Sequence, residues 1–185
     1  AIMVVVSITN EFTYRTIRQN IIDGLSREEF LLSKLWMNVV LSFLSMAAVF
    51  LIALIGGLIY SSEYDFPYGW TGVEFYPIYF LEVFSYLSFA LMLGMLIQRS
   101  GLTIILLLNA ALIELIIKEN INDYVPAIIP FFPLESISNL IPMPWPRYAF
   151  MEIRDYVTVG SVAIALVWTA LFNYFSYLKL KRADI

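Results

Sequence analysis

Long apolar stretches separated by short polar segments dominate the chain. Four of them, at residues 36–60, 78–98, 102–117 and 156–178, approach or reach the length of about 20 residues that a helix needs to cross a bilayer. The third, with 16 residues, lies near the lower limit. The pattern therefore predicts an all-α integral membrane protein with four full spans in a polytopic helical bundle.

Two further apolar regions do not fit a complete span. Residues 1–9 are apolar but too short to cross a core of about 30 Å, so we interpret them as the end of a fifth span. Residues 118–155 are apolar but interrupted by six prolines, and broken backbone at membrane depth needs protein or a cavity around it. We expect re-entrant or interfacial helices there, on the outer side.

The polar segment 10–35 predicts two helical units. Tyr14, Ile17 and Ile21 recur at helical spacing and form one apolar stripe on an amphipathic helix of about three turns, which Gly24 ends. Ser26 and Glu29 then form a capping box at the start of a second helix. That helix runs on through residues 26–60 and would be about 50 Å long.

The composition supports the assignment as a membrane protein and excludes several kinds of functional site. Hydrophobic residues make up 61% of the 185 residues and charged residues only 14%. The chain has no cysteine and no histidine, which excludes disulfides, Cys/His zinc sites, His-ligated haem and a nucleophile–His pair within it. With 11 basic against 15 acidic residues, we expect no nucleic-acid partner.

The distribution of basic residues predicts the orientation. Eight of them fall in segment 10–35, in the turn near residue 99 and at the C-terminus, against three on the opposite side. The positive-inside rule places the first set in the cytoplasm, with a cytoplasmic C-terminus. These eight are Arg15, Arg18, Arg27, Lys34, Arg99, Lys179, Lys181 and Arg182.

Polar residues within the spans are candidates for a translocation path. Glu82 and Glu114 both fall in the outer part of the membrane, where they would face one outward cavity and attract a cationic group. Two alternatives remain open: Glu114 pairs with Lys118 at i+4, and Glu82 reaches interfacial water. Asn109 is a third candidate, although such residues more often bond one helix to another.

Segment 10–35 has two possible roles. A basic amphipathic helix can lie on the lipid surface, but this one has only two arginines and no lysine, so a docking element for a cytoplasmic partner fits better. Residues 11–34 also resemble the cytoplasmic segment of ABC-2 type permease subunits of bacterial exporters. The shared features are Glu11, a short helix, Gly24 with the Ser26-Arg27 turn, and Lys34 leading into a span.

The resemblance implies a six-span permease whose first span and most of its second precede this sequence. It implies a bacterial inner-membrane location, a second permease subunit as homo- or heterodimer, and cytoplasmic ATP-binding subunits that hold ATP and Mg²⁺. The chain itself would hold no cofactor and would not be an enzyme. The short helix would be the coupling helix that docks on the ATPase, through Glu11, Tyr14, Arg15, Ile17, Arg18, Ile21 and Asp23.

Within that implied interface, Tyr14, Ile17 and Ile21 would seat in a groove of the ATPase, and Arg15, Arg18 and Asp23 would fix the register at its rim. The alternative function is a membrane anchor or assembly subunit that docks a cytoplasmic partner and transports nothing. A membrane-embedded transferase is disfavoured, because the two intramembrane acids stand on different helices without histidine or a metal cluster.

Overall fold

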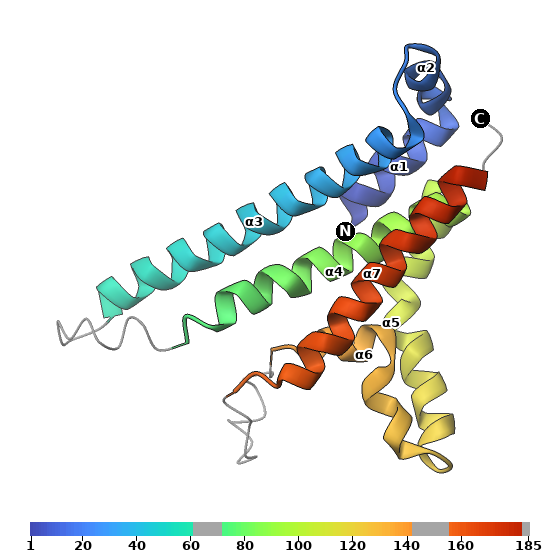
Figure 1. Cartoon of the computed structure of the whole chain (residues 1–185). Helices are drawn as coiled ribbons and strands as arrows, with labels where there is room; N and C mark the ends of the chain where they lie inside the picture. The colour runs from blue at the N-terminus through green and yellow to red at the C-terminus, as the bar shows by residue number, and fades with distance from the viewer. Residues whose placement is uncertain (61–71, 142–155, 183–185) are drawn as a thin grey trace.

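The computed structural model describes residues 1–60, 72–141 and 156–182, and the regular elements in these ranges are helices (Figure 1). Five of them are long, and a seven-residue helix and two six-residue helices complete the set. In chain order they are α1 (Ile2–Thr13), α2 (Thr16–Ile22), α3 (Arg27–Tyr60), α4 (Phe75–Ile97), α5 (Ser100–Asn122), the 3₁₀ helix η2 (Pro126–Phe131), α6 (Pro133–Ser138) and α7 (Val159–Arg182).

Four helices, α3, α4, α5 and α7, are long and apolar enough to cross a membrane. This agrees with the prediction of a multi-pass helical membrane protein. Helix α5 is longer than the apolar stretch 102–117, because nothing that breaks a helix follows Ile117 until Pro126. Its polar last turn therefore continues the same helix to Asn122.

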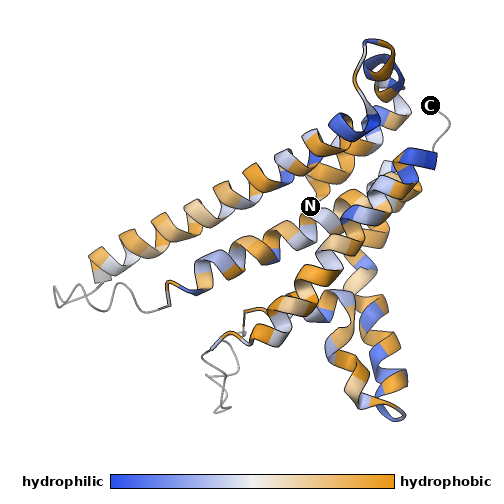
Figure 2. Cartoon of the chain, in the orientation of Figure 1, coloured by the Kyte–Doolittle hydropathy of each residue, from blue (hydrophilic) through white to orange (hydrophobic). Residues whose placement is uncertain are grey.

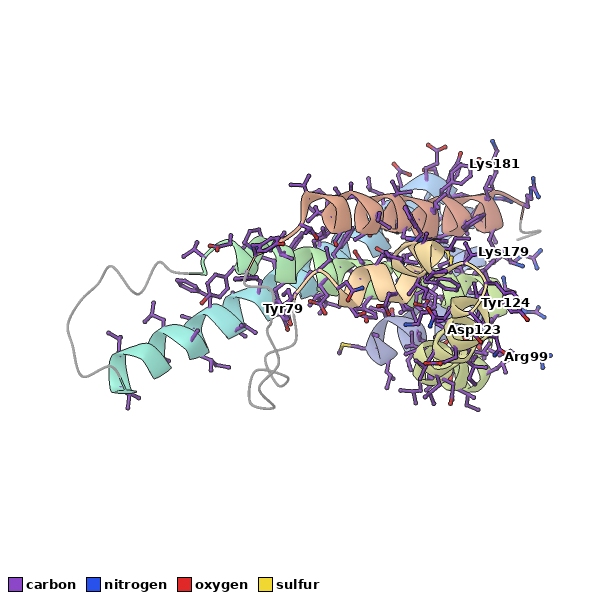
Figure 3. The ribbon with its side chains drawn as sticks, turned by 90° about the horizontal axis from the view of Figure 1, so that it is seen from below. Tyr79, Arg99, Asp123, Tyr124, Lys179 and Lys181 are labelled. Carbon is purple, nitrogen blue, oxygen red and sulfur yellow. The ribbon has the colours of Figure 1, made fainter. Side chains whose placement is uncertain are left out.

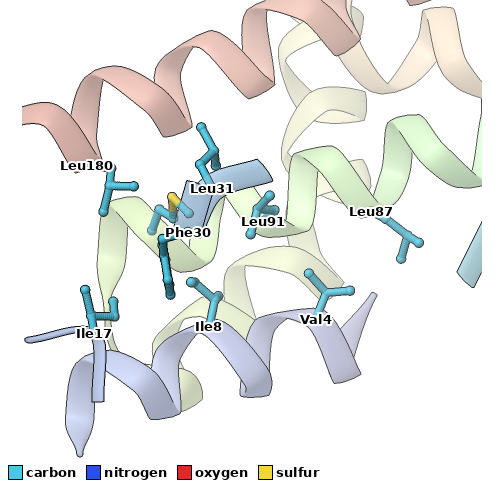
Figure 4. Close-up of a cluster of buried hydrophobic side chains, with 9 residues drawn as sticks. Val4, Ile8, Ile17, Phe30, Leu31, Leu87, Leu91 and Leu180 are labelled. Atoms are coloured by element: carbon cyan, nitrogen blue, oxygen red, sulfur yellow. The ribbon is translucent and has the colours of Figure 1, made fainter. Parts of the chain in front are cut away.

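Helix α4 lies at the centre of the bundle and packs against α1, α3 and α7 (Figure 1). At the end nearest α2, apolar side chains of α1, α2, α3, α4 and α7 meet in one cluster (Figure 4). We call this the inner core; its buried members are Val4, Ile8, Ile17, Phe30, Leu31, Leu87, Leu91, Met95 and Leu180. It fixes how five helices meet.

Close packing of α1 on α4 depends on Gly94. A methyl group at this position would stand 2.4 Å from Cγ2 of Ile8, a residue that is fully buried. Only glycine therefore fits here without moving Ile8. No such contact exists at Gly56 and Gly57 in α3, where a methyl group would meet open space.

The second half of α3 runs beside the first half of α4, away from α5 and α7 (Figure 1). Its side chains are apolar and mostly exposed, as Figure 2 shows by the orange colour of this helix. One aromatic contact and one hydrogen bond join it to α4: Phe50 packs edge-on against Tyr76, and the hydroxyls of Tyr79 and Ser45 lie 3.4 Å apart. Lipid is the solvent that suits such a surface.

Two short helices, η2 and α6, occupy the proline-rich region that the sequence predicts to be broken. Leu134 and Ile137 of α6 pack with Phe172 of α7, and the Trp168 indole N–H donates to the carbonyl of Phe131 at 2.8 Å. Neither helix is long enough to span a bilayer. Residues 142–155 of the predicted outer region lie outside the described residues.

Candidate docking face and intramembrane acids

The predicted amphipathic helix is divided between two elements. Tyr14 closes α1, and Arg15 takes a left-handed conformation, with φ of +56°, before α2 begins at Thr16. Tyr14 is therefore not part of one helical stripe with Ile17 and Ile21, and α2 has only two turns. The expectation of a single three-turn helix is corrected by this break, which no proline or glycine marks in the sequence.

Ile17 points into the protein and not toward a partner. It is only 2% exposed in the inner core (Figure 4). The assignment of Ile17 to a groove of another protein is therefore corrected, while Ile21 packs against the same cluster but is partly exposed, and its docking role stays a prediction. The physical reason is that the ends of α1 and α3 leave apolar surface uncovered, and the apolar side of α2 covers it.

The opposite side of α2 and its flanking residues is exposed. Here Tyr14 is 73% and Ile22 72% exposed, and both are apolar enough to gain from being covered. Three charged residues from the predicted docking set share this exposure. We call the five exposed residues the docking face: Tyr14, Arg15, Arg18, Ile22 and Asp23. Sequence reasoning missed Ile22, which stands beside Ile21 but on the other side of the helix.

Local hydrogen bonds connect α2 rigidly to α3. Gly24 has φ of +103°, and the N–H groups of Gly24 and Leu25 donate to the carbonyls of Ile21 and Asn20, at 3.1 and 3.0 Å. This pair of bonds is the Schellman motif. The predicted capping box follows: the Ser26 N–H donates to Glu29 at 2.8 Å, and the Glu29 N–H donates to Ser26 Oγ at 3.2 Å.

Glu11, one of the predicted docking residues, has an internal partner. Its carboxylate forms an ion pair with Lys34, which joins the end of α1 to α3. Both side chains are largely buried. The two residues that frame the predicted motif therefore bind each other across the loop that contains α2, and Glu11 is not part of the docking face.

Glu114 has a structural partner as well. Its carboxylate is 7% exposed and accepts hydrogen bonds from the backbone N–H groups of Leu134, at 2.9 Å, and Glu135, at 2.6 Å. It therefore caps the N-terminus of α6, whose first N–H groups have no partner within the helix. The alternative of a Glu114–Lys118 pair is corrected, since Lys118 forms its ion pair with Glu135.

Glu135 is the acid of that outer ion pair. Burial opposes its charge, but hydrogen bonds from Lys118 and Asn139 outweigh burial and lower the pKa of the Glu135 carboxyl. The carboxylate stays ionised next to the capped turn. Glu114, Lys118 and Glu135 thus form one polar cluster that holds α6 against α5.

The other two path candidates lie in different surroundings. Glu82 on α4 is half-buried, and its carboxylate has no hydrogen-bond partner among the described residues. Tyr86, one turn further, is within electrostatic range of both Glu82 and Glu114. Asn109 is exposed on α5 and donates to its own helix, at the Ile105 carbonyl, 2.8 Å away. The structure thus brings Glu82 and Glu114 toward one region and leaves Asn109 outside it.

Buried polar residues between α3, α4 and α7 were not predicted as a group. The hydroxyls of Ser85 and Thr169 lie 2.6 Å apart across α4 and α7. Asn38, on α3, is fully buried, and neither polar atom of its amide has a hydrogen-bond partner among the residues that the structure describes. The sequence shows only that single polar residues occur within the spans. It does not show which of these residues contact each other.

Comparison with known proteins identifies the family. A family model described as a protein of unknown function (DUF2705) matches residues 1–185, the whole chain. The chain belongs to the DUF2705 family. The resemblance to ABC-2 type permeases is therefore wrong as a family assignment, because the matching model is a different one. No curated protein and no solved structure matches this DUF2705 chain.

Proposed function

We propose that this DUF2705 protein is the membrane subunit of an ATP-driven exporter, a permease whose ATP-binding partner docks on the cytoplasmic side. One observation carries the proposal. Helix α2 is anchored by Ile17 in the inner core, while its opposite side presents the docking face to solvent. A helix fixed on one side and open on the other is suited to receive a partner.

The connection from α2 into the membrane supports a mechanical role. The Schellman motif, the capping box and the Glu11–Lys34 ion pair hold α2 against the start of α3. Helix α3 then continues for 34 residues without a break. A displacement of α2 by a partner would therefore move α3, whose second half is mostly exposed and would face lipid.

The orientation is part of the proposal. The helix ends that carry most of the predicted cytoplasmic basic residues meet around the inner core, next to α2. In Figure 2 hydrophilic residues stand on α2, the start of α3 and the end of α7 at this end, and a second group stands at the far end of α5. We place this end, with the C-terminus, in the cytoplasm of a bacterium, where ATP is available. A second membrane subunit would complete the translocation path.

The experiment is to purify the tagged full chain from its native membranes, identify the proteins that come with it and measure ATPase activity. We expect an ATP-binding protein, and we expect Tyr14→Ala and Ile22→Asp to reduce the co-purified ATPase activity about tenfold or more. Tyr124→Ala is the matched control, because Tyr124 is 84% exposed at the opposite end of α5. It should retain the activity.

A non-transporting anchor is the second candidate, and the exposed docking face suits it equally. The two candidates differ in the identity of the partner. If Ile22→Asp releases a partner that binds no nucleotide, and no ATPase is present in the wild-type preparation, the anchor function holds and the exporter function is rejected.

A further inference from the structure

A pocket lies where the first turn of α3 meets the last turn of α7. It has a volume of about 180 Å³ and is lined by Arg27, Glu28, Tyr177, Leu180 and Lys181. These residues come from opposite ends of the sequence, and none of them belongs to the docking face. The pocket stands at the end of the apolar part of α7, where a bilayer meets water.

Hydrogen bonds between α3 and α7 hold the walls in place. Arg27 donates through Nη1 to the carbonyl oxygens of Lys181, at 2.7 Å, and Leu180, at 3.4 Å. The Tyr177 hydroxyl donates to Glu28 at 3.1 Å. Both bonds of Arg27 use the same nitrogen, so the rest of its guanidinium fork remains to donate to a ligand.

The charges at this pocket favour an anion. Arg27 and Lys181 contribute two positive charges, against one negative charge on Glu28, which the Tyr177 hydroxyl already stabilises. Lys181 stands over the Tyr177 ring, with Nζ 5.9 Å from its centroid. Lys179 and Arg182 lie in the same turn and add positive charge, while the partial positive charge at the N-terminus of α3 is offset by the partial negative charge at the C-terminus of α7. Figure 3 shows Lys179 and Lys181 at this end of α7.

We propose that this pocket binds the phosphate headgroup of an anionic phospholipid from the adjoining leaflet. A guanidinium fork and an ammonium group together suit a phosphate, and basic pockets between transmembrane helices are suited to lipid headgroups. The tyrosine provides the amphipathic surface that the headgroup region favours. The site requires only that α7 crosses the membrane, so it is independent of the exporter function.

Native mass spectrometry of the purified full chain tests the proposal. The protein, in a neutral detergent, is titrated with phosphatidylglycerol or phosphatidylcholine. We expect phosphatidylglycerol to be retained preferentially, and Lys181→Gln to weaken its binding about fivefold through the loss of one cation near the membrane surface. Arg99→Gln is the matched control, because Arg99 is a cation of the α4–α5 turn and lies outside the pocket. It should bind as the wild type does.

Four outcomes would overturn the proposal. Equal retention of the two lipids would show that headgroup charge is not recognised, and equal losses in Lys181→Gln and Arg99→Gln would show only a diffuse positive field. Displacement of the lipid by millimolar inorganic phosphate would identify free phosphate as the ligand. Glu28→Gln is a second variant that should strengthen phosphatidylglycerol binding, since the Gln carbonyl still accepts from Tyr177, and weaker binding would contradict the proposal.

Discussion

At the end of the bundle that carries α2, a large apolar cluster joins five helices, whereas at the opposite end hydrogen bonds to carboxylates add to a smaller apolar cluster of α6 and α7. The inner core surrounds Ile17 and Ile8 with aliphatic and aromatic neighbours. At the other end, Glu114 caps α6 and Lys118 pairs with Glu135. Apolar contacts do not depend on orientation, whereas hydrogen bonds require donor and acceptor to be aligned, so they fix the orientation of a helix as well as its position.

This difference corresponds to what each end has to hold. Helix α2 has a Schellman motif and a capped neighbour that satisfy its flanking backbone groups locally, so it needs no polar partner on another helix for them, and Ile17 seats it in the inner core. Helix α6 has no side-chain cap from its own N-cap residue, Phe132. Its first N–H groups therefore need an acceptor from another helix, and Glu114 supplies it.

The largest effect on the free energy of unfolding is expected at α2, where substitutions on the buried and the exposed side of the helix should differ. Ile17→Ala removes a fully packed side chain from the inner core and should lower the free energy of unfolding by about 2–5 kcal/mol. Ile22→Ala, on the exposed side of the same helix, should change it by less than about 0.5 kcal/mol. Unfolding by SDS, followed by tryptophan fluorescence, measures both. Similar losses for the two variants would contradict the inward orientation of Ile17.

A smaller loss of stability is expected at the end of the bundle that carries α6. Glu114→Ala leaves the N–H groups of Leu134 and Glu135 without their acceptor, which should cost about 1–3 kcal/mol for a buried donor. Glu119→Ala is the matched control, because Glu119 is exposed on the same helix. Hydrogen exchange of residues 133–138 should accelerate only in Glu114→Ala. Unchanged exchange would reject the capping role and restore Glu114 as a path candidate.

A destabilisation of similar size is expected at Gly94, and a small effect of the opposite sign is expected at Gly56. Gly94→Ala would bring a methyl group against Ile8 and should destabilise the inner core by about 1–3 kcal/mol through overpacking. Gly56→Ala meets open space within a helix and should stabilise α3 by up to about 1 kcal/mol. Thermal unfolding in detergent should therefore shift in opposite directions. A stabilising Gly94→Ala would show that α1 does not pack closely on α4.

Much of the fold could be predicted because it depends on local patterns. The capping box at Ser26 and Glu29 and the turn at Gly24 are set by neighbouring residues, and both are present. The candidate site could be predicted less well. Helical spacing placed Ile17 and Ile21 on an apolar stripe but gave no information on whether this chain or a partner covers it.

The amino-acid sequence by itself determined that the chain has four helices able to cross a membrane, since hydropathy and length are local properties. It also determined where α3 begins. Only the tertiary structure decided which polar groups meet, because Glu11 and Lys34, and likewise Glu114 and the backbone N–H of Leu134, stand about 20 residues apart. Arg27 and Lys181, separated by 154 positions, meet only because α3 and α7 pack at the same end of the bundle.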